Sequence, residues 1–448
     1  MTPHAPAPAD RPLSDVTDAR RAAAELCSDL RRGVMLDAAF DARAATLDAR
    51  DRRWLQELVY GMLRRRAQLD ARLAPRVTGG LARLDPDVVD LLRLGADQLL
   101  HMDSVPAYAA IAQTVELVKQ RHGLGASRLA NAVLRRLDRE RDEPLPPPAD
   151  PVEALALRHS HPRWLVARWV ARWGAADTER LLACNDTEPP IVLRPAGVVR
   201  EQLEAMLESA GVATRESALV PDSLEITAGP VLTETGPCRQ GLFFVQDPGA
   251  TLVTRYAAVP PGARVADLCA APGGKALELA RTAAAVVACD RSTLRMPRLV
   301  GNIARVGAAN VFPVLADARH PAVRAVDAVL LDAPGSGTGT FRRHPDARGR
   351  LKPSDLAVMG ALPRALLRAA AAAVRPGGLL IYSTCSLEPE ENDAQVESFL
   401  ADLQGAFTLE PPPEGAVPAG TLDAGRLRVL PQRHGVDGAF AARLRRLA

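Results

Sequence analysis

Two stretches of this chain hold residue types that could act together in chemistry. The first runs from Asp267 to Lys275 as Asp-Leu-Cys-Ala-Ala-Pro-Gly-Gly-Lys, and its paired glycines let a backbone approach a ligand closely. The second, Tyr382-Ser-Thr-Cys-Ser386, places Cys385 directly after an apolar run, where a thiolate could form a covalent intermediate. Together they predict a cofactor loop beside a nucleophile, and they point to a methyltransferase that attacks a pyrimidine ring.

The elements that must position these stretches alternate from residue 241 onward. Short apolar runs typical of strands are separated by helical segments, which predicts a parallel sheet with crossover helices. Ligands bind at the carboxyl ends of the strands in such sheets. The expected strands are 264–268, 285–289, 310–315, 326–331 and 379–383.

An aspartate stands at or just after the end of each of the first four expected strands: Asp267, Asp290, Asp317 and Asp332. Asp290 is placed to accept hydrogen bonds from both ribose hydroxyls, and Asp317 to accept one from the exocyclic amine of adenine. One such aspartate alone would often be a helix cap. Because buried carboxylates without partners are costly, the whole set predicts a nucleoside cofactor site. The expected cofactor residues are Cys269, Ala270, Ala271, Pro272, Gly273, Gly274, Lys275, Asp290, Asp317 and Asp332.

Cys385 is the candidate nucleophile. Carbon 5 of cytosine is too weak a nucleophile to take a methyl group unaided, and a thiolate that adds to carbon 6 makes the ring enamine-like. A thiol in a sheet is usually just a small hydrophobic residue. The flanking segments 376–378 (Pro-Gly-Gly) and 388–392 (Glu-Pro-Glu-Glu-Asn) favour the nucleophile instead.

The chain of 448 residues is long enough for several domains. Apolar residues at spacings of three and four predict an all-helical N-terminal domain, with helix starts at Asp15 and Asp51 and with Pro86 in a first turn. An amphipathic helix from His161 to Trp173 and then a strand–helix–strand–strand pattern follow. The expected parts are a disordered tail (1–12), the helical domain (13–142), a proline-rich linker with its helix (143–175), a small α+β module (176–240) and the catalytic domain (241–448).

Composition limits the classes of protein that fit. The six cysteines are scattered with no pair at metal-ligand spacing, so we expect no metal site and a reducing cytoplasm. No apolar run is long enough to indicate a membrane span. Arginine clusters at 64–66, 135–136 and 342–343 could contact phosphates, although a solvated helix face is the commoner explanation for each cluster alone.

At these motifs the chain resembles the Sun (Fmu, RsmB-type) family of RNA 5-methylcytosine methyltransferases. The loop 269–275 is similar to the family's S-adenosylmethionine loop, Asp290 and Asp317 to its cofactor acids, and Thr384-Cys-Ser386 to its nucleophile motif. The segments 245–248 and 435–440 resemble its entry motif and its final hairpin. The resemblance implies methyl transfer from S-adenosyl-L-methionine to carbon 5 of a cytosine through a Cys385 adduct, with Asp332 at the cytosine edge and in the cofactor pocket.

The resemblance extends upstream. Segments 51–61, 105–110 and 131–136 look like the NusB-like RNA-binding domain that is fused to the catalytic part in bacterial 16S rRNA members. This fusion implies 16S rRNA or an assembling small ribosomal subunit as the partner, without a membrane, and nothing in the chain indicates more than a monomer. The implied fold is a NusB-like all-α domain, a small α+β (RRM-like) module and a Rossmann-like α/β class I methyltransferase domain.

One position departs from the family pattern. The family's fourth motif usually reads Asp-Ala-Pro-Cys-Ser-Gly-Thr-Gly, and here Gly335 replaces the cysteine of the stretch that begins at Asp332. By resemblance, that cysteine helps to release the methylated product. Its absence leaves Cys385 as the nucleophile and raises the hypothesis that water or a nearby side chain serves as the base that resolves the adduct.

Three alternatives remain open at this stage. A tRNA 5-methylcytosine enzyme would share every catalytic feature and is disfavoured by the NusB-like fusion. A catalytically silent RNA-binding assembly factor would explain Gly335, but Cys385, Lys275 and the cofactor acids count against it. A NAD-dependent dehydrogenase could use the same kind of sheet, but the loop lacks the G-x-G-x-x-G spacing.

Overall fold

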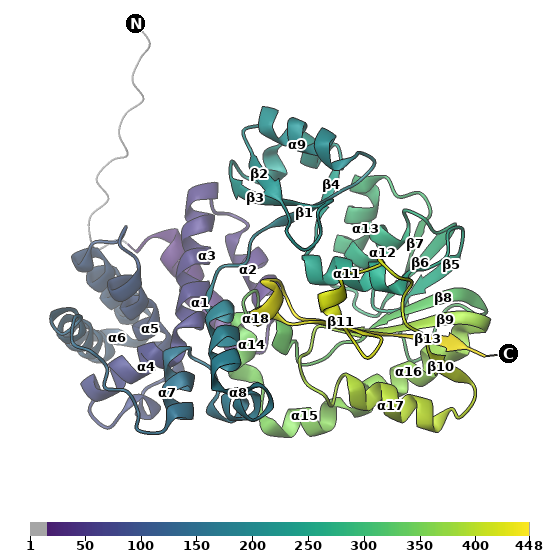
Figure 1. Cartoon of the computed structure of the whole chain (residues 1–448). Coiled ribbons are helices and arrows are strands. Elements are labelled where there is room, and N and C mark those ends of the chain that lie inside the picture. The colour runs from purple at the N-terminus through teal and green to yellow at the C-terminus, as the bar shows by residue number, and fades with distance from the viewer. Residues whose placement is uncertain (1–15, 448) are drawn as a thin grey trace, which may run out of the picture. The chain divides into compact units, whose positions relative to one another are not determined.

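A computed structural model describes residues 16–447 of the chain (Figure 1). Contacts divide the chain into two compact units. The N-terminal unit contains the described residues up to Leu182 together with His344–Gly349, and the C-terminal unit contains Ala183–Arg343 and the residues from Arg350 onward. The expected tail 1–12 and the expected helix start at Asp15 lie outside the described residues.

The N-terminal unit is helical, as predicted. Helix α3 shows why, because Leu55, Leu58, Val59 and Met62 fall on one face and are buried against neighbouring helices. The helices are α1 (Asp18–Arg31), α2 (Leu36–Ala44), α3 (Ala49–Arg64), α4 (Arg66–Leu73), α5 (Pro86–His101), α6 (Ala107–Arg139), α7 (Pro151–Arg158), the start of α8 (Arg163–Asp186) and most of α14 (Pro345–Arg350).

One helix boundary differs from the prediction and another agrees with it. Helix α3 begins at Ala49, two residues before the predicted start, because the Asp48 carboxylate accepts a hydrogen bond from the backbone N–H of Asp51 and caps the helix. The helix expected to end at Trp173 does end there, because Gly174 is non-helical (φ +78°) and α8 consists of two helices joined across this kink. Pro86 does begin α5, as expected.

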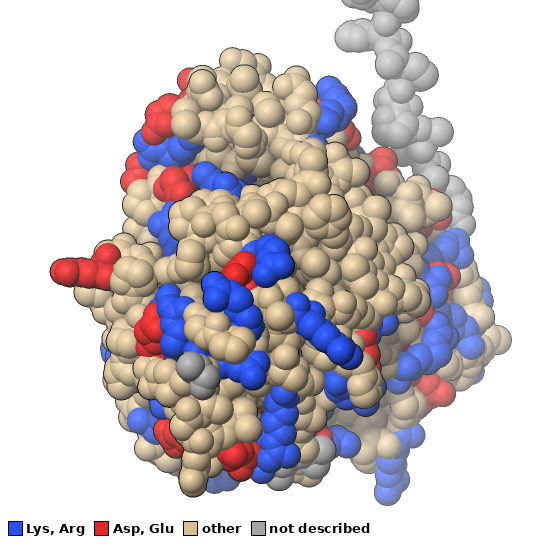
Figure 2. Space-filling view, turned by 90° about the vertical axis from the view of Figure 1, so that its right-hand side faces the viewer, with Lys and Arg blue, Asp and Glu red and all other residues tan. Residues whose placement is uncertain are grey.

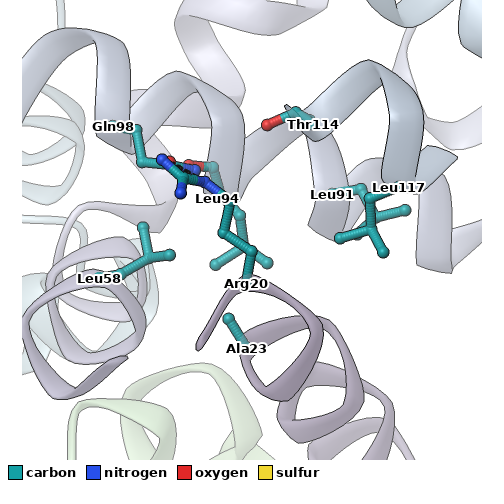
Figure 3. Close-up of a pocket in the computed structure, with 8 residues that line it drawn as sticks. All are labelled: Arg20, Ala23, Leu58, Leu91, Leu94, Gln98, Thr114 and Leu117. Carbon is teal, nitrogen blue, oxygen red and sulfur yellow. Dashed lines mark hydrogen bonds between the residues drawn. The ribbon is translucent and has the colours of Figure 1, made fainter. Parts of the chain in front are cut away.

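A small cavity lies in the core of the N-terminal unit between α1, α3, α5 and α6 (Figure 3). The Arg20 guanidinium enters this core, donates to Gln98 Oε1 at 2.8 Å and stacks over the Trp54 ring. Burial lowers the pKa of Arg20 to about 10. The cavity volume is about 10 Å³, which is room for a single water molecule, so this cavity is a packing feature and not a ligand site.

The small module is a four-stranded antiparallel sheet with strand order β2-β3-β1-β4. Its strands are β1 (Val192–Pro195), β2 (Ala213–Glu216), β3 (Leu224–Ala228) and β4 (Phe243–Val245), and its helices are α9 (Arg200–Ser209) and α10 (Gly236–Arg239). Strand β4 was not predicted, because three residues are too few to show a strand pattern. Its Phe243 nonetheless packs into the module core beside Leu193 and Leu224.

The catalytic domain is built on a mixed sheet with strand order β11-β12-β13-β9-β8-β5-β6-β7, with β10 paired to β13. Strands β5 to β9 are parallel, as predicted, and β10 to β13 add an antiparallel edge that the strand–helix alternation did not indicate. The strands are β5 (Arg264–Asp267), β6 (Ala285–Asp290), β7 (Val311–Leu315), β8 (Val326–Asp332), β9 (Val374–Thr384), β10 (Phe407–Leu409), β11 (Leu422–Asp423), β12 (Arg426–Val429) and β13 (Ala439–Arg446).

Helices cover both faces of this sheet (Figure 1). One face carries α11 (Pro248–Ala257), α12 (Gly274–Leu279) and α13 (Met296–Val306), and the other carries α16 (Ala361–Ala373) and α17 (Asp393–Asp402), while α15 (Pro353–Met359) and α18 (Pro431–His434) lie in connections. Among the described residues, only Pro353–Ala373 is long and apolar enough to pass a test for a membrane span. Within that segment, α16 packs on β8 and β9 as a core helix.

Candidate cofactor and nucleophile site

A cleft of about 150 Å³ opens at the carboxyl ends of the parallel strands. It is formed where the ends of β5 and β8 meet the loop that leads into α12. Most of the predicted cofactor loop faces it, together with residues of the segment that enters α11. The lining residues are Val245, Gln246, Ala250, Asp267, Cys269, Ala270, Ala271, Pro272, Gly274, Lys275 and Asp332.

Gly273 does not line the cleft, but the loop depends on it. Its φ of +110° lies in the left-handed region that glycine tolerates, and a Cβ there would lie 2.8 Å from the Leu299 side chain. The backbone N–H of Gly273 donates to Ala270 O at 2.7 Å, and that of Ala270 donates to Cys289 O at 2.8 Å. The tight turn therefore aims the start of α12 at the cleft.

Asp290 and Asp317 lie outside the set of cleft-lining residues. Asp290 is buried, and its carboxylate accepts from the backbone N–H of Ala271 at 3.2 Å and of Ser292 at 2.8 Å, which ties the end of β6 to the cofactor loop. Asp317 follows β7 and accepts from the Arg319 side chain, which lowers the pKa of Asp317. Both are strand-end carboxylates held in place by nearby donors.

Asp267, one of the four strand-end aspartates but not among the residues expected to bind the cofactor, lines the cleft at the end of β5. Burial, followed by the charge of the neighbouring Asp332 carboxylate, raises the pKa of Asp267 to about 7. Gln246 also lines the cleft, and it accepts a hydrogen bond from Thr251 Oγ1 at 3.0 Å. The signals for both were present in the sequence, in the row of strand-end aspartates and in the entry motif.

Lys275 and Asp332 form an ion pair inside the cleft. The Nζ of Lys275 lies 2.6 Å from Asp332 Oδ2, and Ser383 Oγ donates to Asp332 Oδ1 at 2.7 Å. Burial disfavours the ammonium, but the charges of Asp332 and Asp267 outweigh burial and raise the pKa of Lys275. A charged lysine therefore stands beside the predicted nucleophile.

Cys385 follows β9, the strand adjacent to β8, where Asp332 is paired with Ser383. Cys385 is exposed to solvent. Neighbouring protein atoms nonetheless disfavour its thiolate, and together with the Asp332 charge they raise the pKa of the Cys385 thiol to about 12, while the Lys275 charge opposes the shift. The structure thus brings Cys385, Asp332 and Lys275 together, and the raised pKa favours the thiol over the thiolate.

A second ionic cluster holds the C-terminal hairpin against the same region. Arg343 pairs with Asp247 at 2.7 Å and with Asp437, and the backbone N–H of Gly438 donates to Gly339 O at 2.8 Å. Gly339 in turn donates to Cys385 O at 2.9 Å. Burial and the nearby Asp247 raise the pKa of Asp437 to about 7. Sequence reasoning identified the hairpin but not these partners. Within residues 16–447, no group of three His, Cys, Asp or Glu side chains could hold a metal ion.

Sequence profiles of three families match successive parts of the chain. The NusB family matches residues 17–139, a ferredoxin-like domain of RsmF/B-like methyltransferases matches 161–232, and the 16S rRNA methyltransferase RsmB/F family matches 257–445. These matches confirm the predicted three-part fold class. The match to a methyltransferase family gives no support to the dehydrogenase alternative.

Individual relatives agree over nearly full length. The chain is 33% identical to a probable ribosomal RNA small subunit methyltransferase B of Synechocystis, covering 93% of this chain and 96% of the relative. It is also 33% identical to ribosomal RNA small subunit methyltransferase B of Pseudomonas syringae, covering 95% of this chain and 96% of the relative.

Solved structures show the same fold. The crystal structure of the protein named PH0851 is 28% identical, covers 97% of this chain and 99% of its own, and superposes with a TM-score of 0.80. A methyltransferase homologue from Pyrococcus horikoshii, also 28% identical, covers 65% of this chain and 98% of its own with a TM-score of 0.56. By sequence and by fold, the chain belongs to the RsmB/F family of 16S rRNA methyltransferases.

Proposed function

We propose that this chain transfers a methyl group from S-adenosyl-L-methionine to carbon 5 of a cytosine in 16S rRNA, through a covalent bond between Cys385 Sγ and carbon 6. One observation carries the proposal: Asp332 and Cys385 stand at the ends of adjacent strands beside the cleft, and Lys275 of α12 pairs with Asp332 there. The near-full-length relatives named as ribosomal RNA small subunit methyltransferases support rRNA as the substrate. The family match supports the cofactor.

The residues around the cleft suit this cofactor. S-adenosylmethionine supplies a methyl group on a positively charged sulfur. Asp267 suits a cation, because its raised pKa marks a buried carboxyl that a positive charge would stabilise in its ionised form. We assign the two ribose hydroxyls to Asp290, the adenine amine to Asp317, and the close backbone contacts to 269–274.

Asp332 and Lys275 then prepare the nucleophile. Asp332 raises the pKa of Cys385, so a cytosine amine that donates to Asp332 would offset part of that carboxylate charge. The Lys275 ammonium would then favour the thiolate and stabilise negative charge that develops on the ring as sulfur adds to carbon 6. Substrate binding would therefore favour the reactive thiolate form of Cys385.

The target base must leave its stack to reach Cys385, and the rest of the RNA must be held by its backbone. On the face shown in Figure 2, lysine and arginine side chains are interspersed with acids, and this face lies at the amino ends of the parallel strands, away from the cleft, so we assign no RNA contact to it. The NusB-family region and the small module are the candidates for RNA contact. We place the enzyme in the cytoplasm, where ribosomal subunits assemble.

Labelled methyl transfer to unmodified 16S rRNA tests this function. The wild type should form 5-methylcytosine in 16S rRNA, Cys385→Ser should form none, and the matched control Cys238→Ser should behave as wild type. A preference for tRNA would replace the substrate assignment. No methylation of either RNA despite cofactor binding would overturn the proposal in favour of a silent RNA-binding relative.

A further inference from the structure

Glu391 is a fully buried carboxylate behind the nucleophile loop. Its Oε1 accepts from the backbone N–H of Ser336 at 2.7 Å, and its Oε2 accepts from the hydroxyls of Ser336 and Ser386. Among the described residues, no Lys, Arg or His forms an ion pair with it. Burying a carboxylate without a cation is costly, and these three donors are what stabilise its charge.

The carboxylate of Glu391 occupies the space where a side chain at position 335 would begin. A Cβ on Gly335 would overlap Glu391 Oε1 and would lie 3.2 Å from Glu391 Cδ. A Cβ on Gly337 would lie 4.0 Å from Cys385 Sγ, so the segment 335–337 runs beside the thiol. Gly335 and Glu391 therefore form a matched pair at the position where relatives of the resembled family carry a cysteine.

Ser336 connects this buried carboxylate to the open site. Ser336 is partly exposed, whereas Glu391 is buried. The Oγ of Ser336 lies 3.1 Å from the Oγ of Ser386, which is the residue after Cys385. Because the Ser336 hydroxyl donates its proton toward Glu391, its oxygen lone pairs remain available to a substrate. A hydroxyl activated by an adjacent carboxylate is a stronger proton acceptor than a free one.

We propose that Ser336, backed by Glu391, removes the proton from carbon 5 of the methylated adduct in place of a second thiol. The relay rests on the proposed cytosine chemistry. The electron pair of the C5–H bond forms the C5–C6 double bond, and the pair of the C6–S bond returns to Cys385 as thiolate. The C5 proton passes to Ser336 Oγ, and the hydroxyl proton of Ser336 passes to Glu391. Ser336 is the catalytic residue and Glu391 is the positioning residue that accepts the relayed proton.

The test separates methyl transfer from release. Single-turnover reactions with methyl-labelled S-adenosylmethionine and 16S rRNA are stopped at intervals. At each time we measure the 5-methylcytosine in free RNA and, on denaturing gels, the covalent RNA–protein adduct. Ser336→Ala and Glu391→Gln should leave methyl transfer within about twofold and slow adduct release by roughly a hundredfold, the usual lower contribution of general acid–base catalysis. Ser336→Thr retains a hydroxyl and should restore release. Gly335→Ala should displace the Glu391 carboxylate while keeping the Ser336 hydroxyl in the chain, and it should also slow release of the covalent adduct.

Thr340→Ser is the matched control, because Thr340 lies in the same loop and donates only to Gly337 O; it should release product normally. Thermal melts and cofactor binding confirm that each variant folds. Equal slowing of methyl transfer and release would show a purely structural clamp and overturn the relay, as would normal release in Ser336→Ala. If the wild type itself makes no 5-methylcytosine, the proposed function fails and the relay fails with it. If the wild type makes it and the variants release it normally, only the relay fails.

Discussion

Lys275 and Asp332 meet in a 2.6 Å ion pair although they stand 57 residues apart in the chain. Lys275 is the second residue of α12, after the proposed cofactor loop, and Asp332 ends β8, the strand next to β9. One contact thus joins the proposed cofactor loop to the strand end beside the proposed nucleophile. Substitutions at this pair should therefore affect chemistry more than folding.

Replacement of Lys275 by Met should slow methyl transfer by roughly a hundredfold, because it removes the positive charge that opposes the shift of the Cys385 pKa and that stabilises charge on the ring. Lys275→Arg should retain part of the rate, and Lys352→Met at an exposed lysine should change nothing. Single-turnover rates at saturating cofactor measure the effect. Equal rates in wild type and Lys275→Met would exclude an electrostatic role for this ammonium.

The alkylation rate of Cys385 should report its raised pKa in the free enzyme. With a pKa of about 12, iodoacetamide modification should rise about tenfold per pH unit between pH 7 and about pH 10 without a plateau. Asp332→Asn should shift the curve to lower pH, since the Asp332 charge raises that pKa. Cys385→Ser supplies the background from the other cysteines. A plateau below pH 9 in the wild type would contradict this reading of the site.

Two buried carboxyls should make the free protein less stable as pH rises through the acid range. Asp267 and Asp437 have folded pKa values of about 7 against an ordinary value of 3.8, so the folded state binds more protons between these values. Stability linked to both groups is therefore full below about pH 4 and is lost as pH rises toward 7. Unfolding temperatures measured from pH 4 to 8 should show a shallower decline in Asp267→Asn than in the wild type. An identical pH dependence of the two proteins would refute the assignment.

Binding of a cationic ligand at Asp267 should release protons near neutral pH. A positive charge in the cleft lowers the pKa of that carboxyl from about 7, so part of the population loses a proton on binding. Calorimetry of S-adenosylmethionine binding at pH 7 in buffers of different ionisation enthalpy measures the proton count. Asp267→Asn should abolish the buffer dependence, provided that binding remains measurable. A wild type without buffer dependence would show that the cofactor charge does not reach Asp267.

The small module is joined to the catalytic domain by a buried arginine. Arg194 of β1 is 1% exposed and pairs with Glu278 of α12 at 2.5 Å and with Asp222 at 2.7 Å. Arg194→Met should destabilise the protein by about 3 kcal/mol, the lower end for breaking a buried pair, because Glu278 then keeps only the more distant Arg281 guanidinium, 3.5 Å away. The double variant Arg194→Met/Glu278→Gln should recover part of that loss, and Arg255→Met, at a more exposed partner of Asp222, should cost little. Denaturant unfolding measures the free energy of unfolding of each variant. A double variant no more stable than Arg194→Met would refute a role for the buried Glu278 charge.

Sequence patterns predicted most of the catalytic sheet but not its antiparallel edge. All five expected parallel strands are present, because repeated strand–helix alternation is a long and redundant signal; four match within one residue at each end, and β9 begins five residues before its predicted start. Strand β4 was missed because a run as short as Phe243–Val245 carries almost no periodic signal. Asp48 rather than Asp51 caps α3 because either aspartate suits a cap and only local geometry selects between them.

The site shows the same division. The sequence by itself determined the family, the domain types, the cofactor loop and the nucleophile candidate, because each is written in contiguous residues whose chemistry is local. Only the tertiary structure decided that Lys275 pairs with Asp332, that Asp267 lines the cleft and that Glu391 lies behind Gly335. These relationships join segments that are distant in sequence, and they depend on burial and strand order, which set charge, hydrogen bonding and space around each side chain.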